Sequence, residues 1–323
     1  MPARGGIDLG GTKIQAVVID ASNEVLSEAR HDTPTSGGPP DVAEAMANAL
    51  TEAAGAAGVE TDSLIGVGVG SPGAVDPAAG TLSNPPNLPG WEGAYPLASV
   101  LSEKLGTPAS LGNDVTVATD AEAKLGAGRP YSSLLGVFWG SGVGGGIVLD
   151  GKEWNGRGAA GEIGHVVVEL GGARCGCGRK GCMEAYAGRT RMEAYARKRV
   201  EKGDETQLFE IMEKRGRDRL TSSVWARALD HGDPLAHKIM RRAVEALGAG
   251  VASCLNVLDV EAVIIGGGLG VRLGEDYVRK IEKAVMPHLF MDSRPPDFLL
   301  SELGDLGGAI GASLLVTEPA RVR

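Results

Sequence analysis

The sequence predicts an α/β protein of two lobes, and two observations support this. The chain has 323 residues, which is more than one hydrophobic core usually spans, so two domains or lobes are expected. One motif also occurs twice in the chain, at residues 6–20 and 134–150. It consists of an apolar strand, a glycine-rich turn with a hydroxyl group, and a second apolar strand. Two such hairpins suggest two similar lobes, each with a loop for phosphate groups.

The first hairpin reads GIDLGGTKIQAVVID, with alternating apolar residues on both sides of a Gly-Gly pair. A Walker A loop is excluded, because that motif needs four residues between its first glycine and Gly-Lys-Ser/Thr and must lead into a helix. A glycine turn in a hairpin can still offer backbone N–H groups and the Thr12 hydroxyl to phosphate oxygens. For this stretch alone, an ordinary tight hairpin is the alternative.

Residues 41–57 have apolar side chains at helical spacing, and Asp41 is expected as the N-cap after two prolines. A buried strand over 64–70 and a helix ending near Leu105 follow. Residues 68–73 match G-x-G-x-x-G literally, but a proline-rich loop follows instead of a helix. A dinucleotide-binding turn is therefore rejected here.

Two polar segments of the N-terminal half are candidates for ligand binding. The loop 84–91, NPPNLPGW, could present Asn87 to a polar ligand, although such a segment is most often only a connection. Asn113 and Asp114 stand at a strand end where an amphipathic segment begins. Without further context, Asp114 reads as a helix N-cap.

The second hairpin, LLGVFWGSGVGGGIVLD, carries Ser141 in its glycine turn, and its own G-x-G-x-x-G match is again followed by a strand. Residues 189–242 are charged and helical, with no recognisable chemistry. Apolar residues at intervals of four then predict one long helix over 235–255, on which Cys254 is a small buried residue. A strand at 263–268 runs into glycines that would let a flat ring lie against the backbone, and 307–316 predicts a helix of small residues.

Residues 162–184 contain the most specific signal for a metal. Three cysteines, Cys175, Cys177 and Cys182, lie in a glycine-, arginine- and lysine-rich loop that begins ten residues after His165. Thiolates beside an imidazole suit a tetrahedral structural zinc. The glycines let the backbone fold back so that the sulfurs face one ion. A disulfide or free thiols are the alternatives, but three cysteines leave one unpaired and the first two are too close in sequence to pair comfortably.

Two glutamates, Glu162 and Glu184, bracket this loop. A metal that holds the loop would also fix the position of both carboxylates. Taken singly, each glutamate is more often a solvated surface residue.

Composition excludes some partners. The chain is 43% apolar and 23% charged with a net charge of −9, which is typical of a soluble globular protein and does not favour nucleic acid. A strand-like run directly after Met1 and the absence of a long apolar stretch predict neither a signal peptide nor a membrane span. We therefore expect a cytoplasmic protein, in which cysteines favour metal over disulfide.

Taken together, these motifs resemble the ROK family of bacterial sugar kinases and repressors, within the actin-like ATPase superfamily. The resemblance covers essentially the whole chain. It rests on motifs in the order and spacing of the family: DLGGTK at 8–13, GND at 112–114, GSGVGGG at 140–146, EIGH at 162–165, CGCGRKGC at 175–182, and Glu184. Ser141 departs from it slightly, since threonine is more common there, but the hydroxyl is kept.

The resemblance implies two ribonuclease-H-like lobes with a cleft between them, one formed by 1–114 with 304–323 and the other by 115–303, which carries the zinc loop. It also implies a homodimer or homotetramer. The sugar hydroxyls would be held by Asn87, Asn113, Asp114, Glu162, His165 and Glu184. His165 would use one ring nitrogen for zinc, together with Cys175, Cys177 and Cys182, and the other for the sugar.

For the nucleotide, the resemblance implies phosphate contacts from Asp8, Gly10, Gly11, Thr12 and Lys13 and from Ser141, Gly142, Val143, Gly144, Gly145 and Gly146. Gly266, Gly267 and Gly268 would lie near the adenosine. The implied reaction is ATP-dependent phosphorylation of the glucose 6-hydroxyl, with Mg²⁺ bridging the phosphates and Asp114 as the base. N-acetylmannosamine, N-acetylglucosamine, mannose or fructose remain alternative substrates. A non-catalytic sugar sensor is a further alternative, although such a protein would be expected to have lost Asp114.

Overall fold

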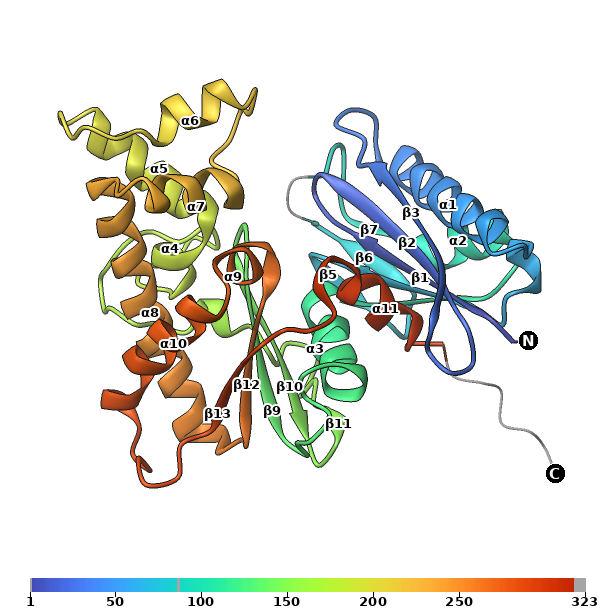
Figure 1. The fold of residues 1–323 in the computed structure, drawn as a ribbon. Coiled ribbons are helices and arrows are strands. Elements are labelled where there is room, and N and C mark those ends of the chain that lie inside the picture. Colours follow the sequence, from blue (N-terminus) through green and yellow to red (C-terminus); the bar gives the residue numbers. More distant parts are fainter. Residues whose placement is uncertain (1, 86–87, 317–323) are drawn as a thin grey trace. The chain divides into compact units, whose positions relative to one another are not determined.

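The protein folds into two compact units, each built on its own five-stranded mixed sheet (Figure 1). The computed structural model describes residues 2–85 and 88–316. The described residues of 1–126 and 303–323 form the first unit, and 127–302 form the second. This division differs from the expected lobes mainly in the segment 115–126, which packs with the first unit.

The first sheet has the strand order β3-β2-β1-β4-β8. Its strands are β1 (Arg4–Leu9), β2 (Lys13–Ile19), β3 (Val25–Asp32), β4 (Val67–Ser71) and β8 (Ala109–Asn113). Strands β1 and β2 are antiparallel, with Leu9 opposite Ile14, whereas β4 runs parallel to both β1 and β8. The first hairpin is therefore confirmed, and the strand expected over 64–70 lies at Val67–Ser71.

Helices cover both faces of this sheet. Helices α1 (Pro39–Ala56) and α2 (Leu97–Leu105) pack on one face, and α3 (Asp114–Leu125) and α11 (Gly307–Ser313) on the other. Successive side chains of a strand point to opposite faces. Val18 of β2 accordingly joins the core under α1, whereas Val17 joins Ala121 and Ile310 on the opposite face. The helices predicted near Leu105 and over 307–316 are confirmed, the latter with its helical turns ending at Ser313.

The start of α1 corrects one sequence prediction. Gly38, not Asp41, is the N-cap, because the two prolines occupy the first helical positions, where no backbone N–H is required. The Asp41 carboxylate instead accepts the backbone N–H of Gly38 at 2.8 Å. Asp41 thus stabilises the same helix end from inside its first turn.

Several short elements complete the first unit. They are the 3₁₀ turns η1 (Thr61–Ser63) and η4 (Gly304–Leu306) and a three-stranded sheet of β5 (Ala74–Asp76), β6 (Thr81–Ser83) and β7 (Ala94–Tyr95). The indole N–H of Trp91 donates to the carbonyl of Leu82 in β6 at 3.1 Å. This bond attaches the loop before β7 to the small sheet.

The second sheet has the order β11-β10-β9-β12-β13. Its strands are β9 (Leu134–Trp139), β10 (Val143–Leu149), β11 (Lys152–Glu153), β12 (Ala262–Gly266) and β13 (Asp297–Leu300). Strands β9 and β10 are antiparallel, with Trp139 opposite Val143. The second hairpin is confirmed, but its turn is shorter than the glycine run suggests, because residues 143–146 are already in β10.

The remaining elements of the second unit are mostly helical. They are η2 (Ile163–His165), α4 (Glu184–Ala187), α5 (Arg189–Val200), α6 (Leu208–Lys214), α7 (Ser222–Asp230), α8 (Pro234–Leu258), α9 (Gly267–Leu273), α10 (Glu275–Val285) and η3 (Met286–His288). The long helix predicted over 235–255 is confirmed as α8, whose N-cap Asp233 accepts the N–H of Ala236 at 2.7 Å. Within the described residues, no helix is both long and apolar enough to span a membrane.

Candidate active site and metal centre

The turn of the first hairpin is held by backbone and hydroxyl bonds. The N–H of Gly10 donates to the carbonyl of Lys13 at 2.9 Å, and the Thr33 hydroxyl, just after β3, donates to the carbonyl of Gly10 at 2.7 Å. Thr12 at the tip is exposed. The predicted phosphate residues Gly10, Gly11, Thr12 and Lys13 thus form one braced turn with an accessible hydroxyl.

Asp8, directly before this turn, has an unusual protonation equilibrium. Burial, and after it the negative charge of Asp114, raise the pKa of Asp8 to about 7, although Lys13 acts in the opposite direction. Asp305 adds to the increase and lies 3.6 Å from the Lys13 ammonium. A Cβ at position 308 of α11 would lie only 2.8 Å from the Asp8 carboxyl carbon, so glycine is required there. This arrangement concentrates negative charge that a bound cation would neutralise.

Asn113 and Asp114 stand where β8 passes into α3. Asn113 is the N-cap: its side-chain oxygen accepts the N–H groups of Val115 at 3.0 Å and Thr116 at 3.2 Å. Asp114 is the first helical residue, and its carboxylate accepts the Val115 N–H at 2.9 Å. The interpretation of Asp114 as an N-cap is therefore wrong. Asn113 takes that role, and Asp114 shares an electrostatic environment with Asp8.

The turn of the second hairpin is bound to an arginine that the sequence analysis did not single out. The Arg189 guanidinium donates to the hydroxyl of Ser141 at 2.8 Å and to that of Ser222 at 3.1 Å. Its backbone N–H also donates to the carbonyl of Gly140 at 3.1 Å. Burial lowers the pKa of Arg189, but an arginine stays charged in proteins. A fixed positive charge therefore lies at the turn predicted to bind phosphate.

Close backbone packing positions Glu162 and His165 beside strand β10. A Cβ at Gly145 would lie 2.6 Å from the Ile163 side chain, and one at Gly164 would lie 2.0 Å from the Val143 carbonyl oxygen. Glycine at both positions lets the turn η2 lie directly on the strand. Part of the glycine run in β10 thus serves packing, a role that the sequence analysis did not assign to it.

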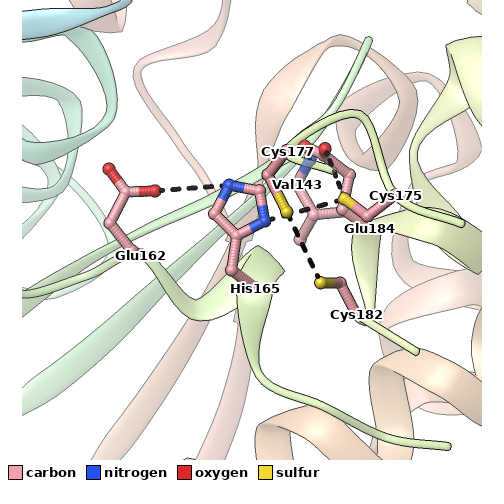
Figure 2. A network of polar contacts seen from close by, with 7 residues as sticks. All are labelled: Val143, Glu162, His165, Cys175, Cys177, Cys182 and Glu184. Atoms are coloured by element: carbon pink, nitrogen blue, oxygen red, sulfur yellow. Dashed lines mark hydrogen bonds and ion pairs between the residues drawn. The ribbon is translucent and has the colours of Figure 1, made fainter. Parts of the chain in front are cut away.

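The four predicted metal ligands converge (Figure 2). Their ligand atoms, one ring nitrogen of His165 and the three Sγ atoms of Cys175, Cys177 and Cys182, all lie within 4.8 Å of one another. The Sγ atoms of Cys177 and Cys182 are 3.8 Å apart, and Cys175 Sγ is 3.8 Å from His165 Nδ1. All four cysteines of the chain are free of disulfides.

These distances fit a tetrahedral zinc. Zinc–sulfur bonds of about 2.3 Å at tetrahedral angles place two sulfurs about 3.8 Å apart, whereas a disulfide would bring them to about 2.0 Å. Cys175 and Cys182 are buried and Cys177 is exposed. The donor set, one imidazole and three thiols, is the type that a structural zinc prefers.

Glycines shape the cysteine loop as predicted. Gly178 and Gly181 have φ values of +87° and +82°, in the region that glycine adopts without strain. A Cβ at Gly181 would lie 1.8 Å from the carbonyl oxygen of Glu169. The loop turn is closed by the N–H of Cys175, which donates to the carbonyl of Arg179 at 2.8 Å.

His165 and Glu184 connect this centre to its surroundings. The Nε2 of His165, on the side of the ring away from the cysteines, lies 3.8 Å from the carboxylate of Glu162, which is 65% exposed (Figure 2). The Glu184 carboxylate accepts the Val143 N–H at 3.1 Å with one oxygen, and the Cys175 thiol lies 3.6 Å from the other. The structure therefore brings Glu162, His165, Glu184 and the cysteines into one constellation.

The glycines at 266–268 end strand β12 and begin α9. Gly267 has a φ of +78°, and a Cβ there would lie 2.7 Å from backbone atoms of Trp139. A Cβ at Gly268 would come no closer than 3.8 Å to the Ser222 hydroxyl, so this position is more open. Asn87, the remaining predicted sugar contact, lies outside the described residues.

Comparison with known proteins identifies the family to which this architecture belongs. The family model described as "ROK family" matches residues 4–319. The chain belongs to the ROK family. Its fold is the actin-like, two-lobed α/β fold of ROK sugar kinases.

Two relatives and one solved structure that are similar to this chain carry two different substrate names. The glucokinase of Thermotoga maritima is 31% identical over 97% of this chain and 96% of its own length. The N-acetylmannosamine kinase of Haemophilus influenzae is 30% identical over 97% and 94%. The ROK glucokinase of Streptomyces griseus, solved with glucose and AMPPNP, is 31% identical with a TM-score of 0.82, covering 97% of this chain and 98% of that one.

Arg189 and Asp305 are two charged residues near these sites that sequence reasoning missed. Arg189 is one of many cations in a charged helical segment, and only its position directly after the cysteine loop and α4 distinguishes it. Asp305 lies in a short turn before α11 with no recognisable motif. Both acquire their importance from contacts with residues far away in the sequence.

Proposed function

We propose that this ROK protein is an ATP-dependent glucokinase that transfers the γ-phosphoryl group to the 6-hydroxyl of glucose. The observation that carries the proposal is that the carboxyl groups of Asp8 and Asp114 lie close enough for the charge of Asp114 to raise the pKa of Asp8, beside the braced glycine turn of the first unit. Phosphoryl transfer needs a base for the attacking hydroxyl and groups that hold the phosphates and their cation. The glucokinases of T. maritima and S. griseus, similar over nearly the full chain, support glucose as the acceptor.

The proposed sugar contacts stand at two places in the chain, the start of α3 and the surroundings of the cysteine loop. Asn113 and Asp114 belong to the first, and Glu162, His165 and Glu184 to the second; Asn87 is proposed from the sequence alone. The ring nitrogen of His165 that faces away from the cysteines is available to a sugar hydroxyl. Carboxylates suit this task, because hydrogen bonds from hydroxyls to charged acceptors are short and strong.

The proposed nucleotide contacts are the two hairpin turns. Asp8 and residues 10–13 in the first unit, and residues 141–146 in the second, would hold the phosphates, with residues 266–268 near the adenosine. Arg189 joins this set through its bond to the Ser141 hydroxyl. Carboxylate and phosphate oxygens are the ligands that Mg²⁺ prefers, so Asp8 fits a position beside the cation of Mg-ATP, which would neutralise phosphate charge.

In the proposed reaction, Asp114 accepts the proton of the sugar 6-hydroxyl. The oxygen then attacks the γ-phosphorus, the bond to the β-phosphate oxygen breaks, and ADP leaves. A positioned base of this kind contributes about 10²- to 10⁴-fold in rate. Asp114 is the first residue of α3, so the start of this helix positions its carboxylate.

We further propose that the cysteine centre binds a structural zinc. Cys175, Cys177, Cys182 and the Nδ1 of His165 would be the ligands. The zinc would fix the loop that carries Glu184, and it would set the tautomer and orientation of His165. In this way a metal without a catalytic step keeps two sugar contacts in place.

The similarity to the N-acetylmannosamine kinase of H. influenzae favours one alternative, an amino-sugar kinase built on the same residues. The decisive experiment measures ADP release from Mg-ATP against glucose, mannose, fructose, N-acetylglucosamine and N-acetylmannosamine, with a no-sugar control. We expect kcat/KM to be highest for glucose. Preference for an N-acetylated sugar would replace glucose as the proposed substrate and leave Asp114 as the proposed base. No turnover with any sugar would overturn the kinase proposal.

A further inference from the structure

A cavity of about 530 Å³ lies in the second unit, on the cysteine loop, outside the proposed sugar and nucleotide contacts. It is open to solvent on one side and is lined by loop residues 173–176 and Gly178, by helix α5, and by one residue each of α4 and α8. Its volume falls within the range of small-molecule pockets. Four of its lining residues are cationic and none is acidic; the cations are Arg174, Arg191, Lys198 and Arg242.

Arg242 is held in place by aromatic rings. Its guanidinium carbon lies 4.4 Å from the ring centre of Tyr186 and 4.7 Å from that of Tyr195. The Tyr186 hydroxyl is itself fixed, because it donates to the carboxylate of Glu169 and accepts the Ala173 N–H at 2.7 Å. Contacts with ring faces leave the in-plane N–H donors of a guanidinium available, and these match the oxygens of a phosphate.

None of the four cations forms an ion pair with any residue that the structure describes. Their neighbours on α5 do: Arg197 pairs with Glu193, and Arg199 with Asp204. In a chain with a net charge of −9, carboxylates are plentiful. Four like charges around one cavity repel each other, and an anion in the cavity would relieve this repulsion.

The metal centre accounts for only part of this charge. Zinc with three thiolates and a neutral imidazole carries a net charge of about −1, which one cation balances. Arg191 fits that role, since a Cβ at Gly176 in the loop would lie 2.4 Å from its guanidinium nitrogen. The positive charges of Arg174, Lys198 and Arg242 are not balanced by the metal centre, so a separate anion bound in the cavity would balance them.

We propose that this cavity binds a small phosphomonoester, with the Arg242 guanidinium as its central donor. Phosphate is the anion whose geometry matches a fixed guanidinium and whose charge matches several cations. The cavity is larger than a free phosphate ion needs, so a phosphate with an organic substituent fits it better. Because Cys175 lies both in the cavity wall and in the metal centre, occupancy restrains the loop and slows release of the metal.

The test is a calorimetric titration of the zinc-loaded protein with glucose 6-phosphate, AMP and inorganic phosphate, each run separately. The pocket variants are Arg242→Gln and Lys198→Gln, and the matched control is Arg241→Gln. Arg241 is exposed on the same helix and does not line the cavity. We expect saturable binding that weakens at least about tenfold in Arg242→Gln, as for the loss of one charged hydrogen bond, and that is unchanged in Arg241→Gln.

Lys198 is exposed, so its variant keeps the proposal testable if Arg242→Gln does not fold. A second readout is the rate at which a chelator removes zinc, which the bound ester should slow in the wild type but not in Arg242→Gln. Tighter binding of the two esters than of inorganic phosphate supports the organic ligand, whereas binding of inorganic phosphate alone contradicts it. No saturable binding, or an equal loss in Arg241→Gln, would overturn the pocket itself. Neither readout depends on turnover, but glucose 6-phosphate and AMP also resemble the products of the proposed kinase reaction. Binding of these esters that Arg242→Gln leaves unchanged would therefore belong to the proposed sugar and nucleotide contacts and would overturn the cavity proposal alone.

Discussion

Glu184 accepts the backbone N–H of Val143 at 3.1 Å and so joins the end of the cysteine loop to the second hairpin. A Cβ at Gly142 would lie 2.3 Å from this carboxylate, so a larger residue there would displace the Glu184 carboxylate from its present position. The proposed metal, sugar and phosphate contacts of the second unit thus meet at one side chain.

Glu184→Gln separates the structural role of this residue from its charge. Glutamine still offers an oxygen to the Val143 N–H, so we expect a melting temperature close to that of the wild type. The sugar loses a charged acceptor, which should raise the KM for glucose by about 10- to 100-fold. Steady-state kinetics and thermal unfolding check both parts, and an unchanged KM for glucose would remove Glu184 from the sugar site.

Asp8→Asn should stabilise the ligand-free protein at neutral pH while abolishing activity. In the unfolded chain Asp8 ionises with the ordinary aspartate pKa of 3.8, whereas in the folded chain its pKa is about 7 and it holds the proton up to that pH. Stability from this group is therefore fully present below pH 3.8 and is lost as the pH rises to 7. At about 1.4 kcal/mol per pKa unit, the loss has an upper bound of about 4 kcal/mol.

Urea unfolding at pH 5 and pH 8 measures this effect. The increase in the free energy of unfolding of Asp8→Asn over the wild type should be larger at pH 8 than at pH 5. Asp305→Asn, which alters an exposed carboxylate, should show a smaller increase in the free energy of unfolding than Asp8→Asn. A gain that is equal at both pH values would contradict the raised pKa. Saturating Mg²⁺ should favour the ionised form and reduce the difference.

Asp114→Asn should lower kcat by about 10²- to 10⁴-fold, because the amide cannot accept the proton of the sugar hydroxyl. The side-chain oxygen remains, so the bond to the Val115 N–H and the start of α3 can persist. Glucose binding, measured by intrinsic fluorescence or calorimetry, should survive. Near-native turnover in this variant would show that another group is the base.

Removal of the metal should impair sugar binding before it unfolds the protein. We expect one zinc per chain by elemental analysis, and a chelator should raise the KM for glucose because His165 and Glu184 lose their anchor. Cys182→Ser should lose the metal. Cys254→Ser is the control, because Cys254 lies on α8 and is not among the clustered ligands. Full activity of metal-free protein would contradict the structural role.

Arg189→Ala should reduce kcat/KM for ATP by about 10- to 100-fold, since it removes a charged donor beside the second hairpin turn. Arg189→Lys should recover part of this loss, because the charge remains but the paired bonds to Ser141 and Ser222 do not. The KM for glucose should change little. Lys202→Ala, an exposed cation after α5, is the control, and an equal effect there would mean that Arg189 has no specific role.

Local patterns predicted much of the fold. Both hairpins, helix α8 and the loop of Cys175 to Cys182 follow from residue spacing, since each is set by neighbours in the chain. Strand β3 and helix α10 were missed. The sequence of β3 is largely polar because it is an edge strand with only Ala29 buried, so it lacks the alternation that marks a half-buried strand.

The sequence by itself determined the family resemblance, and it predicted the candidate metal ligands and the candidate catalytic residues, because these depend on residue type and short spacing. Only the tertiary structure decided the pKa of Asp8, the partners of Arg189 and the cationic cavity at Arg242. Each of these depends on side chains from separate elements, and electrostatic and hydrogen-bond energies depend on distance in space. Sheet order and helix packing set those distances, and no local pattern in the chain encodes them.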